Sequence, residues 1–347
     1  MLVCGAKCVS HSPHPPPFQS RCSNRPAVIL PGLGNNSGDY QKLEATLNNK
    51  YGVSTVVAKV SRLDWFRNAA GLIDPNYWRG TLQPSPVLDW YLKRVHDAVQ
   101  EAIDLAPPAS TLSLIGHSAG GWLARLYMEQ FGVSNISLLL TLGTPHLPAP
   151  KGVPGVIDQT RGLLDYVEQY CSKPVYTPEL KYVCIAGRYI EGAPLFANSN
   201  PTLEPLIPTT VTEAATATTS SPNITLRARF VGQGYKQVCG KADVWGDGVV
   251  PQLSAQLEGA LNISLDGVYH SPLGSDDATR PWYKVENLLE NPYEVLMTTT
   301  ILKVGENNFQ LVEDGNLTSS SIELLCRSLH PIQAVTYNPC AEANIEI

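Results

Sequence analysis

The chain has 347 residues, of which 43% are hydrophobic and 16% charged, and its formal net charge is -6. This is the composition of an ordinary globular protein with one sizeable core. The sequence contains no long basic run, so a nucleic-acid partner is not expected. It also contains no apolar stretch of the roughly 18 residues that a transmembrane helix needs.

The N-terminal segment has an unusual charge pattern. No Asp or Glu occurs before Asp39, whereas Lys7, Arg21, Arg25, several serines and a run of prolines are present. An acid-free leader that bears Ser and Arg is typical of organelle transit peptides. We therefore expect residues 1–25 to be a transit peptide and the protein to lie in the chloroplast. A disordered leader and a cytoplasmic location are the alternatives.

The cysteines do not form a metal-binding or disulfide pattern. They are spread over the chain without a C-x-x-C pair, which argues against a zinc site and against a dense disulfide framework. The positions are Cys4, Cys8, Cys22, Cys171, Cys184, Cys239, Cys326 and Cys340.

Apolar runs bounded by turn residues alternate along the chain with segments of helical periodicity. In chain order they predict a strand at 27–30, a strand at 53–60, a loop with Trp65 and Trp78, a helix beginning at Ser85-Pro86 and ended by Pro107-Pro108, a strand at 111–115, a helix at 120–131, a strand at 136–142, a helix at 156–170, a strand at 182–186 and a last strand at 261–269. This alternation predicts an α/β fold with a mostly parallel central sheet and helices on both faces.

Two segments interrupt the pattern. Residues 198–225 are rich in Thr, Ser, Ala and Pro and are expected to be a low-complexity surface insertion. Residues 286–347 show little core pattern apart from a helix expected near 322–328. The predicted organisation is therefore a leader, one domain at 26–285 that contains the insertion, and a tail of unclear structure.

The sequence LSLIGHSAGG at residues 112–121 places Ser118 between two glycines, where a strand ends and a helix begins. Small residues on both sides of a serine in this context are the pattern of a nucleophile elbow. Bulky side chains at Gly116 or Gly120 would collide with the adjoining strand and helix, and the sharp turn exposes the hydroxyl. We predict that Ser118 is a catalytic nucleophile; a Ser-Gly turn without a function is the alternative.

A serine hydroxyl is a weak nucleophile near neutral pH and needs a base. His270 lies just past the last predicted strand and before a Ser-Pro loop, where its imidazole could reach Ser118, so it is the predicted base. The other histidines are less well placed to act as the base. His11 and His14 lie in the expected leader, His330 lies in the tail, and His96 lies on a predicted helix. His117 lies in the elbow but is expected to point away from the serine, and His146 follows a strand end, where it could line the site.

The imidazole base must be held in one tautomer by a carboxylate. In the segment DVWGDGVVP, Asp247 is flanked by glycines and followed by an apolar run, so it is the first choice, and Asp243 is the second. Asp266 is too close in sequence to the strand that carries the base.

The oxyanion of a tetrahedral intermediate needs two N–H donors. The residue after the nucleophile, Ala119, supplies one, and a loop after an early strand supplies the other. The loop LPGLGNNSG at 30–38 offers the N–H of Leu33. Its glycine spacing does not fit a dinucleotide or phosphate loop.

These motifs together resemble the lipase-type α/β-hydrolase superfamily. PGLG resembles its oxyanion loop, GHSAGG its elbow, LGTPH a segment after the following strand, and GDGVVP its acid loop. Within the superfamily the chain is similar to plant, plastid-directed lipase-like hydrolases described as similar to GPI-inositol deacylases. The resemblance covers roughly residues 26 to 285, and it implies Ser118, Asp247 and His270 as the triad and Leu33 and Ala119 as the oxyanion donors.

The expected function is a serine hydrolase that cleaves carboxylic esters through an acyl-enzyme, without a cofactor or metal. The alternatives are a thioesterase or acyltransferase with the same triad, or a non-catalytic ligand receptor on this fold. The partner would be a small-molecule or lipid ester, and peripheral association with a membrane stays open. Apolar and aromatic residues expected near the mouth of the active site favour a lipophilic acyl or alcohol group in the substrate, unless most of these residues belong to the core. The residues are Leu33, Trp65, Trp78, Trp122, Leu147 and Trp245.

Overall fold

The computed structural model describes residues 25–108, 110–171, 176–177, 179–195, 225–276 and 278–283. The predicted leader apart from Arg25, the predicted insertion apart from Thr225, and the tail at 286–347 with its expected helix lie outside the described residues. The predictions of plastid targeting, of a surface insertion and of the domain limits therefore stay predictions.

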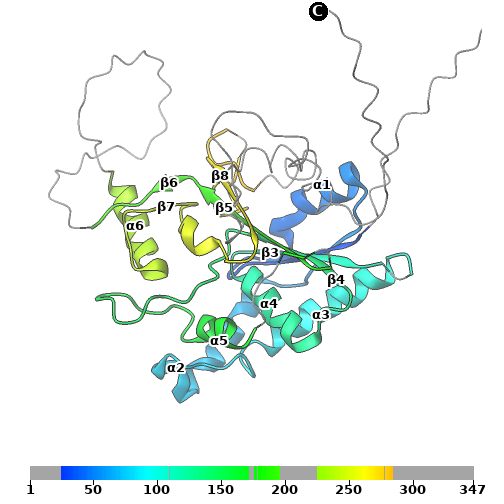
Figure 1. Ribbon diagram of the computed structural model, residues 1–347, viewed down its shortest axis with the longest axis horizontal. Coiled ribbons are helices and arrows are strands. Elements are labelled where there is room, and N and C mark those ends of the chain that lie inside the picture. Colours follow the sequence, from blue (N-terminus) through cyan, green and yellow to red (C-terminus); the bar gives the residue numbers. More distant parts are fainter. Residues whose placement is uncertain are drawn as a thin grey trace, which may run out of the picture.

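Six strands form one parallel sheet with the order β2-β1-β3-β4-β5-β8 (Figure 1). They are β1 (Ala27–Leu30), β2 (Thr55–Val57), β3 (Leu112–His117), β4 (Ile136–Leu142), β5 (Lys181–Arg188) and β8 (Leu261–Asp266). A separate antiparallel pair consists of β6 (Ile190–Glu191) and β7 (Trp245–Gly246). Because parallel strands need crossover connections, successive strands of this sheet are joined by long segments, and each of these segments contains a helix.

The α-helices in the described ranges are α1 (Gln41–Tyr51), α2 (Pro75–Arg79), α3 (Asp89–Asp104), α4 (Ala119–Phe131), α5 (Leu163–Tyr170) and α6 (Leu226–Cys239). Three 3-10 helices accompany them: η1 (Ser37–Tyr40), η2 (Arg62–Ile73) and η3 (Gln252–Ala255). None of these helices combines the length and the apolarity needed to cross a membrane.

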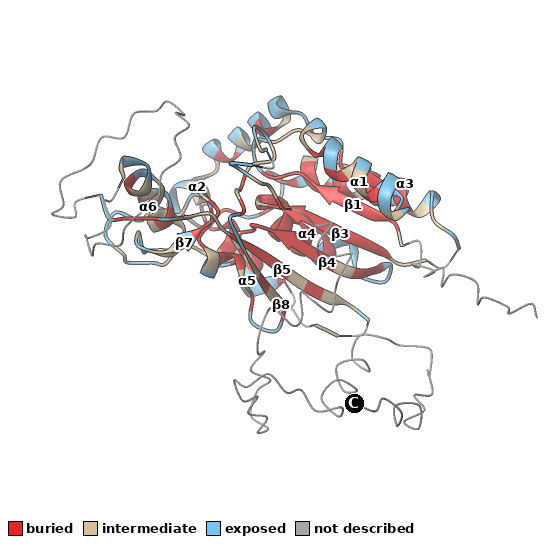
Figure 2. Cartoon of the chain, turned by 90° about the horizontal axis from the view of Figure 1, so that it is seen from above, coloured by how far each residue is buried: buried red, intermediate tan, exposed pale blue. Residues whose placement is uncertain are grey.

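The sheet is buried on both faces, as the side chains of β1 illustrate. Val28 and Leu30 pack in a core shared with α3, α4 and α5, whereas Ala27 and Ile29 point to the other face and pack in a core with α1. The central strands are accordingly buried along their length (Figure 2), which is why they read as continuous apolar runs rather than as alternating ones. The predicted α/β class, with helices on both faces, is confirmed.

Several element boundaries differ from the prediction. The strands expected at 53–60 and 261–269 are shorter, and those expected at 111–115 and 182–186 are longer. The helix expected from Ser85-Pro86 begins only at Asp89, because residues 85–88 form a turn.

Two predicted segments were wrong in kind or extent. The helix expected at 156–170 begins at Leu163, because Arg161 and Gly162 both have positive φ angles, 54° and 100°, which a right-handed helix does not accommodate. The loop expected around Trp65 and Trp78 is instead helical, forming η2 and α2.

Candidate active site

Ser118 occupies a sharp turn between β3 and α4. Its backbone has φ 52° and ψ -126°, a combination that non-glycine residues rarely adopt. The Ser118 N–H donates to the carbonyl of Leu142 on the neighbouring strand at 2.9 Å. The turn therefore ends the strand at the carboxyl edge of the sheet and places Ser118 directly before the N-terminus of α4.

The glycines on both sides of Ser118 are required by close backbone approaches. A Cβ at Gly116 would overlap the backbone of Gly121, and a Cβ at Gly120 would overlap the carbonyl of Leu30. The elbow is thus packed too tightly for any side chain at these two positions, as the sequence pattern predicts.

The structure brings Ser118, His270 and Asp247 into one hydrogen-bonded chain. Ser118 Oγ lies 3.1 Å from His270 Nε2, and His270 Nδ1 lies 2.7 Å from Asp247 Oδ2. A carboxylate can only accept, so Nδ1 carries a proton and Nε2 presents its lone pair to the serine hydroxyl. This is the tautomer that a histidine base needs.

Asp247 is fully buried and surrounded by donors. Burial raises the pKa of this carboxyl, but His270, the backbone N–H of Val250 and the hydroxyl of Tyr283 outweigh it and hold the pKa below its usual value. Its Oδ1 accepts from the N–H groups of Val249 and Val250 at 3.0 and 2.7 Å, and its Oδ2 accepts from Tyr283 at 2.7 Å. Asp247 therefore remains an anion in the protein interior.

The other acid candidates lie on the surface. Asp243 is exposed. Asp266 is also exposed and forms an ion pair with Arg188 at 3.1 Å. Neither shares a recorded contact with a histidine in the described residues.

Two other histidines in the described residues, His96 and His146, are engaged elsewhere. His96 Nδ1 lies 3.3 Å from Tyr127 Oη, and its ring stacks on Phe131. His146 does not line the site, contrary to the expectation: it is fully buried, and its Nε2 lies 3.0 Å from Thr141 Oγ1. Burial lowers the pKa of His146 well below its ordinary value, so it stays neutral.

The loop that carries Leu33 runs directly beside the serine. A Cβ added at Gly32 would lie 2.8 Å from Ser118 Cβ. No acceptor among the described residues is recorded for the N–H of Leu33. The N–H of Ala119 is the first of α4 and therefore has no acceptor within the helix. Ala119 thus offers a backbone donor next to Ser118, and the loop that carries Leu33 lies beside the serine.

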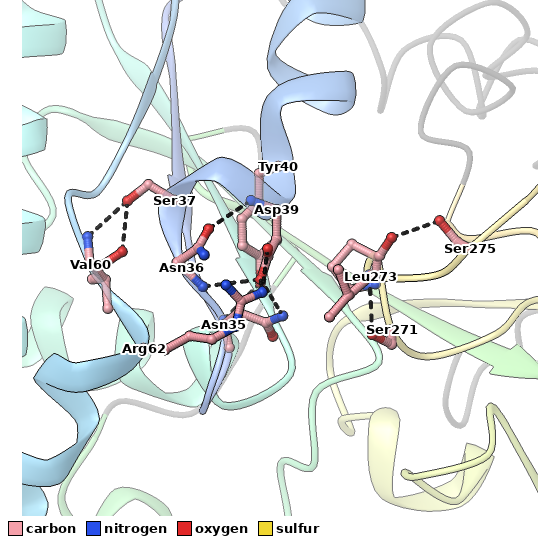
Figure 3. Close-up of polar contacts among 12 residues, drawn as sticks. Asn35, Asn36, Ser37, Asp39, Tyr40, Val60, Arg62, Ser271, Leu273 and Ser275 are labelled. Carbon is pink, nitrogen blue, oxygen red and sulfur yellow. Dashed lines mark hydrogen bonds and ion pairs between the residues drawn. The ribbon is translucent and has the colours of Figure 1, made fainter.

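The carboxylate of Asp39 binds residues 35 and 36 of this loop (Figure 3). Asp39 Oδ2 accepts from Asn35 Nδ2 at 3.0 Å and from the Asn36 N–H at 3.1 Å, and Arg62 Nη2 lies 2.7 Å from Asp39 Oδ1. Trp65 Nε1 adds a hydrogen bond to the Asn35 carbonyl at 2.8 Å. These contacts fix the path of the chain between β1 and α1.

The residues expected at the mouth divide into two groups. Trp65 and Trp122 are buried members of the core, so the expectation was wrong for them. The other four side chains are at least 39% exposed: Leu33, Trp78, Leu147 and Trp245. Among the described residues, no group of three or more His, Cys, Asp or Glu side chains is arranged to hold a metal ion.

Replacing Gly120 by alanine is expected to destabilise the protein, because the new methyl group would meet rigid backbone rather than a mobile side chain. Overpacking of this kind costs about 3 kcal/mol at the upper end of its usual range. Denaturant unfolding of Gly120→Ala measures the loss.

Gly234→Ala is the matched control for that substitution. Gly234 lies in α6, and a Cβ there meets nothing within 4 Å. This variant should gain about 0.5–1 kcal/mol from helix propensity. Equal stability of the two variants would contradict the packing argument.

A comparison with protein families matches one part of the chain. A family model, the PGAP1-like alpha/beta domain, matches residues 21–173. No curated protein matches the chain. The matched range begins within the predicted leader and ends past α5, so it contains the Leu33 loop and Ser118 but neither Asp247 nor His270.

Solved structures similar to this chain include lipase BlEst2 of Bacillus licheniformis, at 16% identity over 75% of this chain and 89% of that chain, with a TM-score of 0.37. The product of gene lin2722 of Listeria innocua has 14% identity over 78% and 93%, with a TM-score of 0.39. A methylesterase of Arabidopsis has 14% identity over 48% and 78%, with a TM-score of 0.28. These values are too low to carry over an activity or a substrate.

The parallel order of the six strands and the elbow between β3 and α4 are those of the α/β-hydrolase fold. The predicted fold class is confirmed, and over residues 21–173 the chain is similar to the PGAP1-like alpha/beta domain.

Proposed function

We propose that this protein is a serine hydrolase that cleaves carboxylic esters through an acyl-enzyme. The observation that supports the proposal is the hydrogen-bonded chain from Asp247 through His270 to Ser118, which begins at a strained elbow residue. Strain of this kind is costly, and it persists where the surrounding structure holds a functional group in place. The proposed roles are nucleophile for Ser118, base for His270 and orienting anion for Asp247.

In the acylation step, Ser118 Oγ attacks the ester carbonyl carbon while its proton passes to His270 Nε2. The carbonyl π electrons move to oxygen, and the resulting oxyanion accepts hydrogen bonds from the N–H groups of Leu33 and Ala119. When the C–O bond to the alcohol breaks, His270 returns the proton to the leaving oxygen. The acyl group then remains on Ser118.

In the deacylation step, water takes the place of the alcohol. His270 removes a proton from the water as its oxygen attacks the acyl carbon, and the same proton is returned to Ser118 Oγ as the acid leaves. Asp247 stabilises the imidazolium in both steps without becoming protonated. Its pKa, held low by His270, Val250 and Tyr283 against the effect of burial, is consistent with this role.

The experiment that tests the proposal combines covalent labelling with ester turnover. A fluorophosphonate probe should phosphonylate Ser118 with loss of fluoride, as located by peptide mass spectrometry. Hydrolysis of a p-nitrophenyl ester should fall in proportion to the labelled fraction. Labelling at another residue, or full turnover after complete labelling, would overturn the proposal. Recovery of the acyl group as free acid rather than as a new ester separates hydrolysis from acyl transfer.

A further inference from the structure

Two buried side chains connect the Leu33 loop to His270. Tyr40 is the last residue of η1 and His117 is the last residue of β3, and both are at most 1% exposed. Tyr40 Oη accepts from the N–H of Gly32 at 2.9 Å and lies 2.8 Å from His117 Nδ1. His117 Nε2 lies 2.9 Å from the backbone carbonyl of His270. Segments that are far apart in sequence are thus joined by three consecutive hydrogen bonds.

The direction of every proton in this chain is determined by its two ends. The Gly32 N–H can only donate, so Tyr40 Oη accepts there and directs its own proton to His117 Nδ1. The ring proton of His117 must then lie on Nε2, where it meets a carbonyl that can only accept. A single neutral tautomer therefore satisfies the whole chain.

The surroundings keep both side chains in these states. Burial, followed by the nearby His270, lowers the pKa of His117 to about 3, although the His270 carbonyl, Asp247 and Asp39 act in the opposite direction. Burial also raises the pKa of Tyr40 well above its ordinary value. The imidazole remains neutral and the phenol remains protonated throughout the range in which an ester hydrolase would work.

The three connected segments are the ones that the proposed chemistry must keep in register. Gly32 directly precedes Leu33, His117 directly precedes Ser118, and the accepting carbonyl belongs to His270 itself. Trp282 Nε1 donates to the same carbonyl at 3.0 Å, so that oxygen has two donors. A shift of the Leu33 loop relative to His270 would break hydrogen bonds in an interior where the freed groups find no water.

We propose that Tyr40 and His117 are positioning residues, which hold the oxyanion donor of Leu33 in a fixed relation to Ser118 and His270 through the hydrogen-bond chain Gly32–Tyr40–His117–His270. The inference rests on the proposed function. It assigns to the elbow histidine a role that its sequence position alone does not indicate.

The first test is Tyr40→Phe, which removes only the hydroxyl. We expect kcat for a p-nitrophenyl ester to fall about 100-fold, the effect typical of a misplaced reacting group, with KM changed much less. Tyr127→Phe is the matched control, because Tyr127 is another buried tyrosine that contacts a histidine, His96, away from Ser118. Its kcat should equal that of the wild type. An unchanged kcat in Tyr40→Phe would overturn the inference.

The second test replaces His117 in two ways. Gln offers an amide oxygen to Tyr40 and an amide N–H to the His270 carbonyl, so His117→Gln should retain most of the kcat, whereas His117→Leu should lose it to the same extent as Tyr40→Phe. The double variant Tyr40→Phe/His117→Leu should be no worse than the poorer single variant. Additive losses would mean independent packing effects and would overturn the inference.

The outcomes separate this inference from the proposed function. If the wild-type protein neither hydrolyses the ester nor reacts with fluorophosphonate at Ser118, the proposed function itself fails. If the wild type does both and Tyr40→Phe does so equally well, only the positioning role fails. Denaturant unfolding of each variant shows whether a loss of kcat occurs in folded protein.

Discussion

Ser118→Ala is expected to lower kcat for ester hydrolysis by about 10⁶-fold, as removal of a triad nucleophile does elsewhere. Alanine retains the Cβ and lacks only the hydroxyl, so the strained backbone at this position is no worse accommodated than with serine. The hydrogen bond to His270 Nε2 is lost. The folded structure should therefore remain while the acyl-enzyme can no longer form.

The measurement is steady-state hydrolysis of a p-nitrophenyl ester, with active sites counted by fluorophosphonate in the wild type. Because the triad works as a unit, the double variant Ser118→Ala/His270→Ala should be no slower than Ser118→Ala alone. Retention of more than about 1% of the wild-type kcat by well-folded Ser118→Ala would exclude nucleophilic catalysis by this residue.

Asp247→Asn is expected to lower kcat by about 10⁴-fold. The contacts recorded for the carboxylate all come from donors: His270 Nδ1 and Tyr283 Oη at one oxygen, and two backbone N–H groups at the other. An amide N–H₂ on the Oδ1 side would face two backbone N–H groups, which cannot accept from it. On the Oδ2 side it would face the N–H of His270, which cannot accept while the ring proton stays on Nδ1. His270 can relieve one conflict by moving its proton to Nε2, and it then cannot accept the proton of Ser118.

The control for this variant is Asp243→Asn, which alters an exposed carboxylate in the same segment and should leave kcat unchanged. The comparison also decides between the two carboxylates that the sequence offers. If Asp243→Asn caused the larger loss, the proposed role of Asp247 would be wrong. Unfolding measurements on Asp247→Asn should show a loss of about 1–3 kcal/mol, since buried donors lose their partner.

The strands of the parallel sheet were predictable because each lies in a short apolar run that ends near turn residues, whereas β6 and β7 were not predicted. The strand 136–142 has the predicted limits, and that at 112–117 is longer than expected because the sheet continues into the elbow. Helices α1 and α6 were not predicted, and in α6 Gly232 and Gly234 weaken the helical pattern. The structure explains Gly232: a side chain there would overlap the backbone of Ala193. Such a close contact between distant segments leaves no local pattern.

Among the residues of the candidate site, too, some could be located from the sequence and others could not. Ser118 could be located from its neighbours, because the steric requirement of the elbow is local. Tyr283 and Tyr40 could not, because their importance comes from contacts with Asp247 and His117, from which they are separated by 36 and 77 positions. Tyrosines are common in buried cores, so their residue type alone carried no signal.

The amino-acid sequence by itself determined the parallel sheet, the helices α3, α4 and α5 and the position of the strained serine, because hydrophobic periodicity and the steric demands of glycine act over a few residues. Only the tertiary structure decided which carboxylate faces His270, that His146 is buried away from the site, and how Tyr40 and His117 link two loops. Those facts depend on which distant groups share a dry interior, where each polar atom must find its partner.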